Sequence, residues 1–267
     1  PQQVSEKFSS AMVAYHSGQY AEATLLFEEF FKEYKIVDEV YASAKYYSAE
    51  SLLKLSRKNE AAVTFAYLID NFQWSNFRED ALYNIGLVYF SLKNYENSRN
   101  RFKQLLSEYP ESKYTGSALY WIGESYTAEN KTDEAIKFLE EAVNDKRNNR
   151  FADYSLYTLA STYEQRGDYQ NAVKYYDQLL SFHPNSKLAP VAQIRIGMAY
   201  FKLKDYQASI LELNNPMLKT LPEDLYSESL YLLANSYYRV QEYQNAEKTY
   251  SEIISEFQSS KFFISAN

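Results

Sequence analysis

Small and apolar residues recur along the whole chain at spacings of three, four and seven, the pattern of helices that bury one face. The pattern is clearest over residues 80–110, which predict two short amphipathic helices joined at Lys93-Asn94. Gly86 lies in the middle of the first of these helices. A glycine there costs a helix about 1 kcal/mol relative to alanine. We therefore expect that a second helix packs closely against Gly86.

The same unit recurs with a period of 37 residues after a first step of 38, and four columns stay in register. The first helix carries a small residue at Ala11, Ala49, Gly86, Gly123, Ala160, Gly197 and Ala234. Tyrosine follows three positions later in most units, at Tyr89, Tyr126, Tyr163, Tyr200 and Tyr237. The second helix has a small residue at Ala23, Ala61, Ser98, Ala135, Ala172, Ser209 and Ala246. Four positions later comes a large apolar residue, at Phe27, Phe65, Phe102, Leu139, Tyr176, Leu213 and Tyr250. This register predicts an array of helical hairpins.

The columns divide the chain into one array of about seven hairpins. Their expected bounds are 1–35, 39–73, 76–111, 113–149, 150–185, 187–221 and 223–258, with the start of an eighth at 260–267. Residues 260–266 align with 112–118, four periods earlier. An array that stops there would expose apolar surface on its last hairpin, so we expect the sequence to be cut from a longer array.

The sixth unit departs from the pattern because Pro216 falls inside its expected second helix. Proline lacks a backbone donor and clashes with the preceding turn, which costs a helix about 3 kcal/mol or more. We expect this helix to end near Leu213 and residues 214–222 to be irregular. Two interpretations stay open: a frayed loop, or a break that redirects the array or contacts a partner.

The four columns, with Pro110 or Pro184 closing a unit, resemble the tetratricopeptide repeat over nearly the whole chain. Especially similar to its consensus are Tyr83-Asn84-Ile85-Gly86 and Asn94-Tyr95. The resemblance implies an all-α fold, a right-handed superhelical solenoid of helical hairpins. The period is longer than the family's 34 residues, and this feature, with residues 109–114 and 118–124, is similar to bacterial envelope repeat proteins of the Tol-Pal accessory and outer-membrane assembly lipoprotein types. That narrower resemblance implies a periplasmic or outer-membrane-associated protein, with the cytoplasm as the alternative.

The resemblance also implies a concave groove lined by the first helices, where such proteins hold extended peptides or partner helices. One groove column lies three residues before the small residue and is mostly tyrosine, which offers a large contact area with a polar tip. The expected partner-binding residues are Tyr46, Tyr83, Tyr120, Tyr157, Tyr231, Leu87, Phe90, Glu124, Arg195, Met198, Phe201, Asn235 and Tyr238. The alternative is that the tyrosines only pack between neighbouring repeats.

Charge along this groove is uneven. Arg195, Lys202 and Arg239 gather towards the C-terminal units, whereas Glu50, Asp80 and Glu124 lie earlier. This polarity would orient a peptide with an acidic end, or it is scattered surface charge. The Lys and Asn cluster with which related chaperone adaptors clamp a C-terminal carboxylate is absent from the groove columns, so we expect no binding of chaperone tails.

Composition narrows the class of function. A net charge of −7 argues against nucleic acid, whose binding needs clustered Lys and Arg. No run of 18 apolar residues is present, so we expect no transmembrane segment. The chain has no cysteine, only two histidines (His16 and His183, both at turns) and none of the common catalytic or nucleotide-binding motifs. We therefore expect no enzyme, no cofactor and no metal site.

The leading hypothesis is a non-catalytic scaffold that binds a protein or peptide. The alternatives are a cytoplasmic adaptor, a docking or regulatory module of a larger enzyme, and a structural role through self-association.

Overall fold

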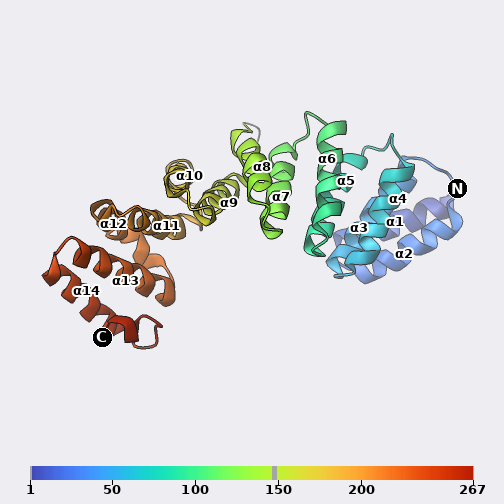
Figure 1. The fold of residues 1–267 in the computed structure, drawn as a ribbon. Helices are drawn as coiled ribbons and strands as arrows, with labels where there is room; N and C mark the ends of the chain where they lie inside the picture. The colour runs from blue at the N-terminus through green and yellow to red at the C-terminus, as the bar shows by residue number, and fades with distance from the viewer. Residues whose placement is uncertain (1, 146–148, 267) are drawn as a thin grey trace. The chain divides into compact units, whose positions relative to one another are not determined.

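All regular elements of the computed structural model, which describes residues 2–145 and 149–266, are helices, so the predicted all-α fold is confirmed (Figure 1). The helices are α1 (Gln2–His16), α2 (Tyr20–Glu33), α3 (Glu39–Lys54), α4 (Lys58–Asn71), α5 (Arg78–Ser91), α6 (Tyr95–Glu108), α7 (Thr115–Ala128), α8 (Thr132–Asn144), α9 (Ala152–Gln165), α10 (Tyr169–Phe182), α11 (Ala189–Lys202), α12 (Tyr206–Leu213), the 3-10 helix η1 (Pro216–Thr220), α13 (Glu223–Arg239), α14 (Tyr243–Glu256) and α15 (Phe263–Ala266). None of these helices is long and apolar enough to cross a membrane.

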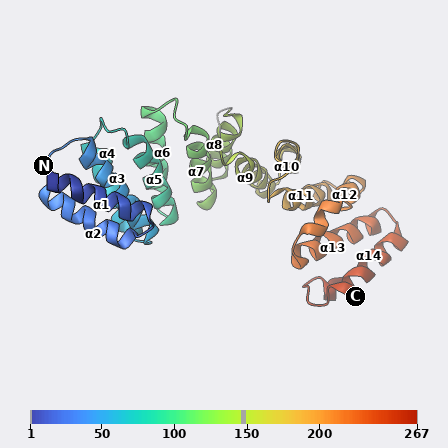
Figure 2. The same cartoon turned by 180° about the vertical axis from the view of Figure 1, so that it is seen from behind.

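The described residues form two compact units. Unit 1 contains α1 to α7, and unit 2 contains α8 to α15 with η1. Within each unit, consecutive helices pack as hairpins, such as α1 with α2 and α13 with α14 (Figure 2). Each hairpin also packs on the next one, as α4 does on α5 and α10 on α11. The arrangement within each unit is a stack of helical hairpins, and a single array through both units stays a prediction.

The turn inside each hairpin contains one residue in the left-handed conformation. These residues recur at the period of the sequence: Gly18, Ser56, Lys93, Asn130, Gly167, Lys204 and Gln241, with φ between 58° and 82°. The second helix begins two residues later, and the side chain of the residue in between caps that helix in several hairpins. Asp168 accepts a hydrogen bond from the backbone N–H of Asn171 at 3.2 Å, and Asp205 from that of Ala208 at 3.1 Å.

Close packing inside the hairpins explains the small-residue columns. A Cβ atom on Gly86 would lie 2.6 Å from the ring of Phe102 on α6, so the expected close approach of a second helix is confirmed. Ser98 adds a hydrogen bond from its hydroxyl to the Gly86 carbonyl, at 2.8 Å. Small residues at these columns therefore let the two helices of a hairpin approach closely enough for both kinds of contact.

A serine between hairpins ties hairpins three, four and six to the previous one. The Ser112 hydroxyl donates to the Glu79 carboxylate at 2.5 Å and accepts from the Tyr114 backbone N–H at 3.0 Å. Ser75 pairs with Glu39 at 3.1 Å in the same way. In unit 2 the equivalent bond joins Ser186 to Asp153 at 2.6 Å. In these three hairpins the bond fixes the start of the first helix against the first turn of the preceding first helix.

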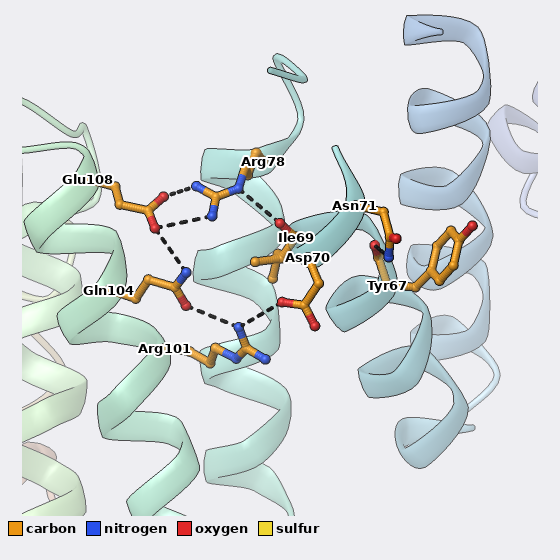
Figure 3. Close-up of polar contacts among 8 residues, drawn as sticks. All are labelled: Tyr67, Ile69, Asp70, Asn71, Arg78, Arg101, Gln104 and Glu108. Carbon is orange, nitrogen blue, oxygen red and sulfur yellow. Dashed lines mark hydrogen bonds and ion pairs between the residues drawn. The ribbon is translucent and has the colours of Figure 1, made fainter. Parts of the chain in front are cut away.

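Unit 1 has an additional polar clasp around Arg78, whose side chain is nearly buried (Figure 3). Arg78 donates to the Ile69 carbonyl at the end of α4, at 3.1 Å, and its guanidinium pairs with the Glu108 carboxylate at the end of α6. Gln104 donates to the same carboxylate at 2.9 Å and accepts from Arg101 at 3.1 Å. The clasp joins the ends of α4 and α6 to the start of α5.

The sixth hairpin ends its second helix early. As predicted, α12 stops at Leu213, but the expectation of an irregular segment after it is wrong for residues 216–220, which form η1. Asn215 caps η1 by accepting from the Met217 backbone N–H at 3.0 Å. Leu218 is 1% exposed and packs in a cluster with Ile194, Leu213 and Leu233. The frayed-loop interpretation is therefore also wrong: the break is an ordered turn with its own buried side chain.

Candidate partner-binding surface

Each unit has its own first-helix face, which is formed by α1, α3, α5 and α7 in unit 1 and by α9, α11 and α13 in unit 2. The predicted tyrosine column of unit 1 lies mostly below this surface, since Tyr46, Tyr83 and Tyr120 are 9%, 3% and 5% exposed. The Tyr83 ring stacks on Tyr114 with centroids 4.1 Å apart and an interplanar angle of 8°. Tyr46 contacts Phe77 with a centroid distance of 5.1 Å.

The tyrosine column of unit 2 makes related contacts. Tyr231 is half-buried and stacks on Phe262 at 5.2 Å, and Tyr157 is half-buried and meets Tyr176 edge-on at 5.6 Å. Tyr46, Tyr83 and Tyr231 each meet the aromatic ring that lies 31 residues later in the sequence. Packing between neighbouring hairpins accounts for these three contacts, whereas Tyr157 and Tyr176 belong to the two helices of one hairpin. Binding of a partner by this column stays a prediction.

Glu50 joins three first helices of unit 1 through a hydrogen-bond network. Its carboxylate accepts from the Tyr15 hydroxyl on α1 at 2.6 Å and from the Tyr46 hydroxyl at 3.2 Å. Asn84 on α5 donates to the Tyr46 hydroxyl at 3.0 Å. Burial, and then the neighbouring Glu50 carboxylate, raise the pKa of both Tyr15 and Tyr46. The two phenols therefore stay protonated and act as donors that hold Glu50 in place.

Unit 1 presents aromatic side chains on the same face. Phe90 is half-buried and meets Trp121 of α7 edge-on, with centroids 4.7 Å apart. Tyr47 contacts Tyr15 at 5.0 Å, while the predicted residues Leu87 and Glu124 are half-buried nearby on α5 and α7. Partly exposed aromatic rings bury a large area on binding at little cost in side-chain entropy.

Unit 2 has a cleft between α9 and α11, which we call the Arg195 cleft. Its volume is about 220 Å³, and it is lined by Ser161, Glu164, Gln165, Tyr169, Arg195 and Lys202. Glu164 accepts from the Tyr176 hydroxyl at 3.0 Å and from Arg195 at 3.4 Å. The Arg195 side chain is 40% exposed, compared with 18% for Glu164.

The charges of the Arg195 cleft favour an anionic group. Burial alone would lower the pKa of Arg195, but Glu164 and the nearby phenols hold that pKa above its ordinary value, so the guanidinium stays charged. Lys202 is exposed and forms no ion pair with any residue that the structure describes. One guanidinium shared with Glu164 and one unneutralised ammonium can together bind a carboxylate.

The other predicted residues of unit 2 lie on α11 and α13. Met198 is brought next to Arg195, with its sulfur 3.7 Å from the guanidinium, and Phe201 meets Tyr206 of α12 at 5.2 Å. Asn235 donates to the backbone carbonyl of Tyr231 at 2.7 Å. Tyr238 is 58% exposed. Of these four residues, Met198 is the one brought against Arg195 by a hydrogen bond that the described structure shows.

Of the cleft residues, Ser161 and Glu164 lie in the first-helix columns that were expected to face the groove, but Gln165 and Tyr169 do not. Gln165 ends α9 and lies outside the small-residue and apolar columns. Tyr169 begins α10 in a column that repeats as Tyr20, Tyr95, Tyr169, Tyr206 and Tyr243. That repeated tyrosine was a signal for Tyr169, whereas Gln165 was marked only by its position at a turn next to Glu164. Among residues 2–145 and 149–266, no group of three His, Cys, Asp or Glu side chains is arranged to hold a metal ion.

Comparisons with known proteins agree with this architecture. A family model described as tetratricopeptide repeat matches residues 77–148, and a second with the same description matches residues 154–186 and 228–260. Together these spans cover about half of the chain. No curated protein sequence gives a significant match.

Solved structures with a similar fold come from several bacteria. The C-terminal part of a repeat-containing protein from Cytophaga hutchinsonii is 14% identical, with 97% of this chain and 98% of that chain covered and a TM-score of 0.78. A tetratricopeptide repeat protein from Parabacteroides merdae is 14% identical over 100% and 98% of the two chains, with a TM-score of 0.63. MamA from Desulfovibrio magneticus is 16% identical over 70% and 98%, with a TM-score of 0.59. At such identities the likeness concerns the fold alone.

Proposed function

Because the chain belongs to the tetratricopeptide repeat family, whose repeats generally mediate protein–protein interaction, we propose that it is a non-catalytic scaffold that binds a partner protein on its first-helix face. The observation that carries this proposal is the Arg195 cleft, where Arg195 and Lys202 provide exposed positive charge on a chain of net charge −7. A partner segment with an acidic side chain fits this cleft.

The Glu164 carboxylate has a positioning role in this proposal. Because it is held by the Tyr176 hydroxyl, it fixes the Arg195 guanidinium while leaving part of it exposed. A pre-positioned guanidinium loses less entropy when it binds a carboxylate. In unit 1, the half-buried rings of Phe90 and Trp121 would contact apolar residues of a partner.

Burial dictates how the proposal is tested. Replacing Tyr83 and Tyr120 with alanine would remove core side chains, so a loss of binding would not distinguish a contact from a damaged fold. A photo-crosslinking residue at exposed Gln165, on the rim of the Arg195 cleft, leaves the packing intact. The matched control carries the same residue at exposed Gln170, which lies on α10 outside the cleft.

We expect Gln165 to crosslink a protein in the source cells and Gln170 to give no such product. Adding Arg195→Gln and Lys202→Gln to the Gln165 variant should reduce the crosslinked product at least fivefold, while circular dichroism shows unchanged helicity. Equal yields at both positions, or a product that survives the two substitutions, would refute binding at the Arg195 cleft.

The setting of this function is also part of the proposal. A bacterial envelope, periplasmic or at the outer membrane, is supported by the 37-residue period and by the similarity of residues 109–114 and 118–124 to envelope repeat proteins. Fractionation of the source cells, followed by immunoblotting, tests it. Recovery of the protein with the cytoplasmic markers would replace the envelope with a cytoplasmic adaptor.

A further inference from the structure

The broken hairpin of unit 2 borders a second cleft, on the side of its second helices. This Lys248 cleft has a volume of about 330 Å³ and is lined by residues of α12, η1, α13 and α14 and of the turn before η1, among them Asn214, Asn215, Pro216, Lys219, Asn245 and Lys248. Four of these residues belong to the break itself, between the end of α12 and the end of η1.

The shape of the Lys248 cleft follows from the early end of α12. Helix α12 has 8 residues, whereas α10, the second helix of the preceding hairpin, has 14. Pro216 stands one period after Leu179, which is buried near the end of α10. The last turns of an ordinary second helix are therefore missing here, and η1 takes a different path. Leu213, Leu230 and Leu233 form the floor of the cleft.

The rim of this cleft is basic and polar. Lys219 on η1 and Lys248 on α14 are exposed, and neither forms an ion pair within the described part of the chain. The only acidic residue in the lining is Glu252, which accepts a long hydrogen bond of 3.4 Å from the Tyr226 hydroxyl. Asn214 and Asn245 add carboxamide oxygens, which are acceptors. The amide group of Asn214 already donates to the Ile210 carbonyl and the Tyr237 hydroxyl, and that of Asn245 donates to Glu242.

A cleft at the same place in the repeat of unit 1 shows why this rim is unusual. It includes Lys45 and Thr64, and Thr64 lies five periods before Thr249. The Lys45 ammonium lies 3.7 Å from the centroid of the Phe31 ring and is also near Tyr67, so aromatic faces of the same unit already contact it. Lys219 and Lys248 have no such ring contact among the described residues.

We propose that the Lys248 cleft is a second binding site, which takes a short acidic peptide segment of a partner protein. The carboxylate binds between Lys219 and Lys248, and an apolar side chain of the peptide packs on the leucine floor. Backbone N–H groups of the peptide donate to the carboxamide oxygens of Asn214 and Asn245. A polyanion such as nucleic acid fits this cleft poorly, because two lysines neutralise few phosphates and the chain as a whole has a net charge of −7.

A defined peptide pair tests this site directly. Isotope-labelled protein is titrated with the tetrapeptide Ac-Leu-Glu-Leu-Glu-NH2 and with its glutamine counterpart, and the backbone amide shifts are followed by NMR. We expect saturable shifts at Asn215, Lys219 and Lys248 with the glutamate peptide, and at least threefold weaker binding of the glutamine peptide. Inorganic phosphate should compete only weakly, because it cannot use the leucine floor.

Matched variants locate the effect. The double substitution Lys219→Gln and Lys248→Gln should weaken binding of the glutamate peptide at least fivefold. The control, Lys187→Gln with Lys204→Gln, makes the same change of net charge at two exposed residues outside the cleft and should leave the affinity unchanged. Equal affinity for the two peptides, equal weakening by the control pair, or phosphate binding tighter than the peptide would each overturn the proposal. Shifts confined to the Arg195 cleft would overturn it as well, while supporting the function proposed above.

Discussion

Hairpin three, in unit 1, and hairpin six, in unit 2, begin their second helices in the same way. In hairpin three the Ser98 hydroxyl donates to the Gly86 carbonyl at 2.8 Å, and in hairpin six Ser209 donates to Gly197 at 2.9 Å. A Cβ atom on either glycine would lie 2.6 Å from the large side chain four residues after the serine, Phe102 in one case and Leu213 in the other.

The two hairpins diverge immediately after these contacts. Helix α6 continues to Glu108 and buries Leu105, which is 0% exposed. In hairpin six, three periods later, the position that corresponds to Leu105 is Pro216, and α12 ends before it. Hairpin three then adds the Arg78 clasp at its end (Figure 3). Hairpin six instead inserts Leu218 from η1. The comparison teaches that the first half of the second helix defines a hairpin, while its second half can be rebuilt.

The strongest way to break the comparison is to put the proline into the regular hairpin. Leu105→Pro disrupts α6 at a cost of about 3 kcal/mol or more and also removes a buried leucine, a loss of about 2–5 kcal/mol. No equivalent of Leu218 follows in hairpin three to compensate. We expect unit 1 to lose at least about 5 kcal/mol of stability, measured by urea unfolding. Protection of α5 and α6 from hydrogen exchange should collapse. A mild effect would mean that any hairpin of this chain tolerates the break.

The second test asks whether η1 truly replaces the missing helix. Leu218→Ala should destabilise unit 2 by about 2–5 kcal/mol, the range for a fully buried leucine. The matched control is Leu211→Ala on α12, which is 73% exposed and should change stability by less than about 0.5 kcal/mol. If both substitutions have the same small effect, the break is a passive loop and not a rebuilt core.

Much of the fold could be predicted because the repeat supplies the same information several times. Gly86 predicted a close helix contact, and Pro216 predicted the end of α12. The 3-10 helix after Pro216 could not be predicted, because it depends on Leu218 finding a place beside Ile194 and Leu233. Such a contact joins residues that are distant in the sequence and belongs to one hairpin, so it leaves no repeated pattern in the sequence.

The candidate site was less accessible to sequence reasoning. A tyrosine in a repeated column fits equally well a binding surface and a contact between hairpins, and only burial shows how far Tyr83 lies from the solvent. Conversely, the sequence identified Arg195 and Lys202 as positive residues of the groove. It could not show that Glu164 holds the Arg195 guanidinium in place, because that contact joins two different helices. The Lys248 cleft could not be predicted from the sequence, because its rim combines residues of η1 and α14, which are distant along the chain.

A third test compares the two glycines. Alanine at Gly86 or Gly197 overpacks the hairpin, typically by about 1–3 kcal/mol, but gains about 1 kcal/mol of helix propensity. We expect a net loss of about 1–2 kcal/mol for Gly86→Ala, because Phe102 lies in the middle of α6 and its ring is rigid. Gly197→Ala should be milder, since Leu213 ends α12 and can shift. Thermal unfolding ranks the two, and a larger effect at Gly197 would contradict this account.

The smallest expected effect sharpens the part that both hairpins share. Lys93 in hairpin three and Lys204 in hairpin six hold left-handed backbone conformations, with φ of 59° and 64°, which glycine adopts without strain. Lys93→Gly and Lys204→Gly should each stabilise the protein by about 0.5–1 kcal/mol, the strain relieved exceeding the entropy that glycine loses on folding. Gly167→Ala, at the same turn position with φ of 82°, should destabilise by a similar amount. If the gains at Lys93 and Lys204 differ by more than the error of urea unfolding, the turns are not equivalent, and the divergence of hairpin six begins before Pro216.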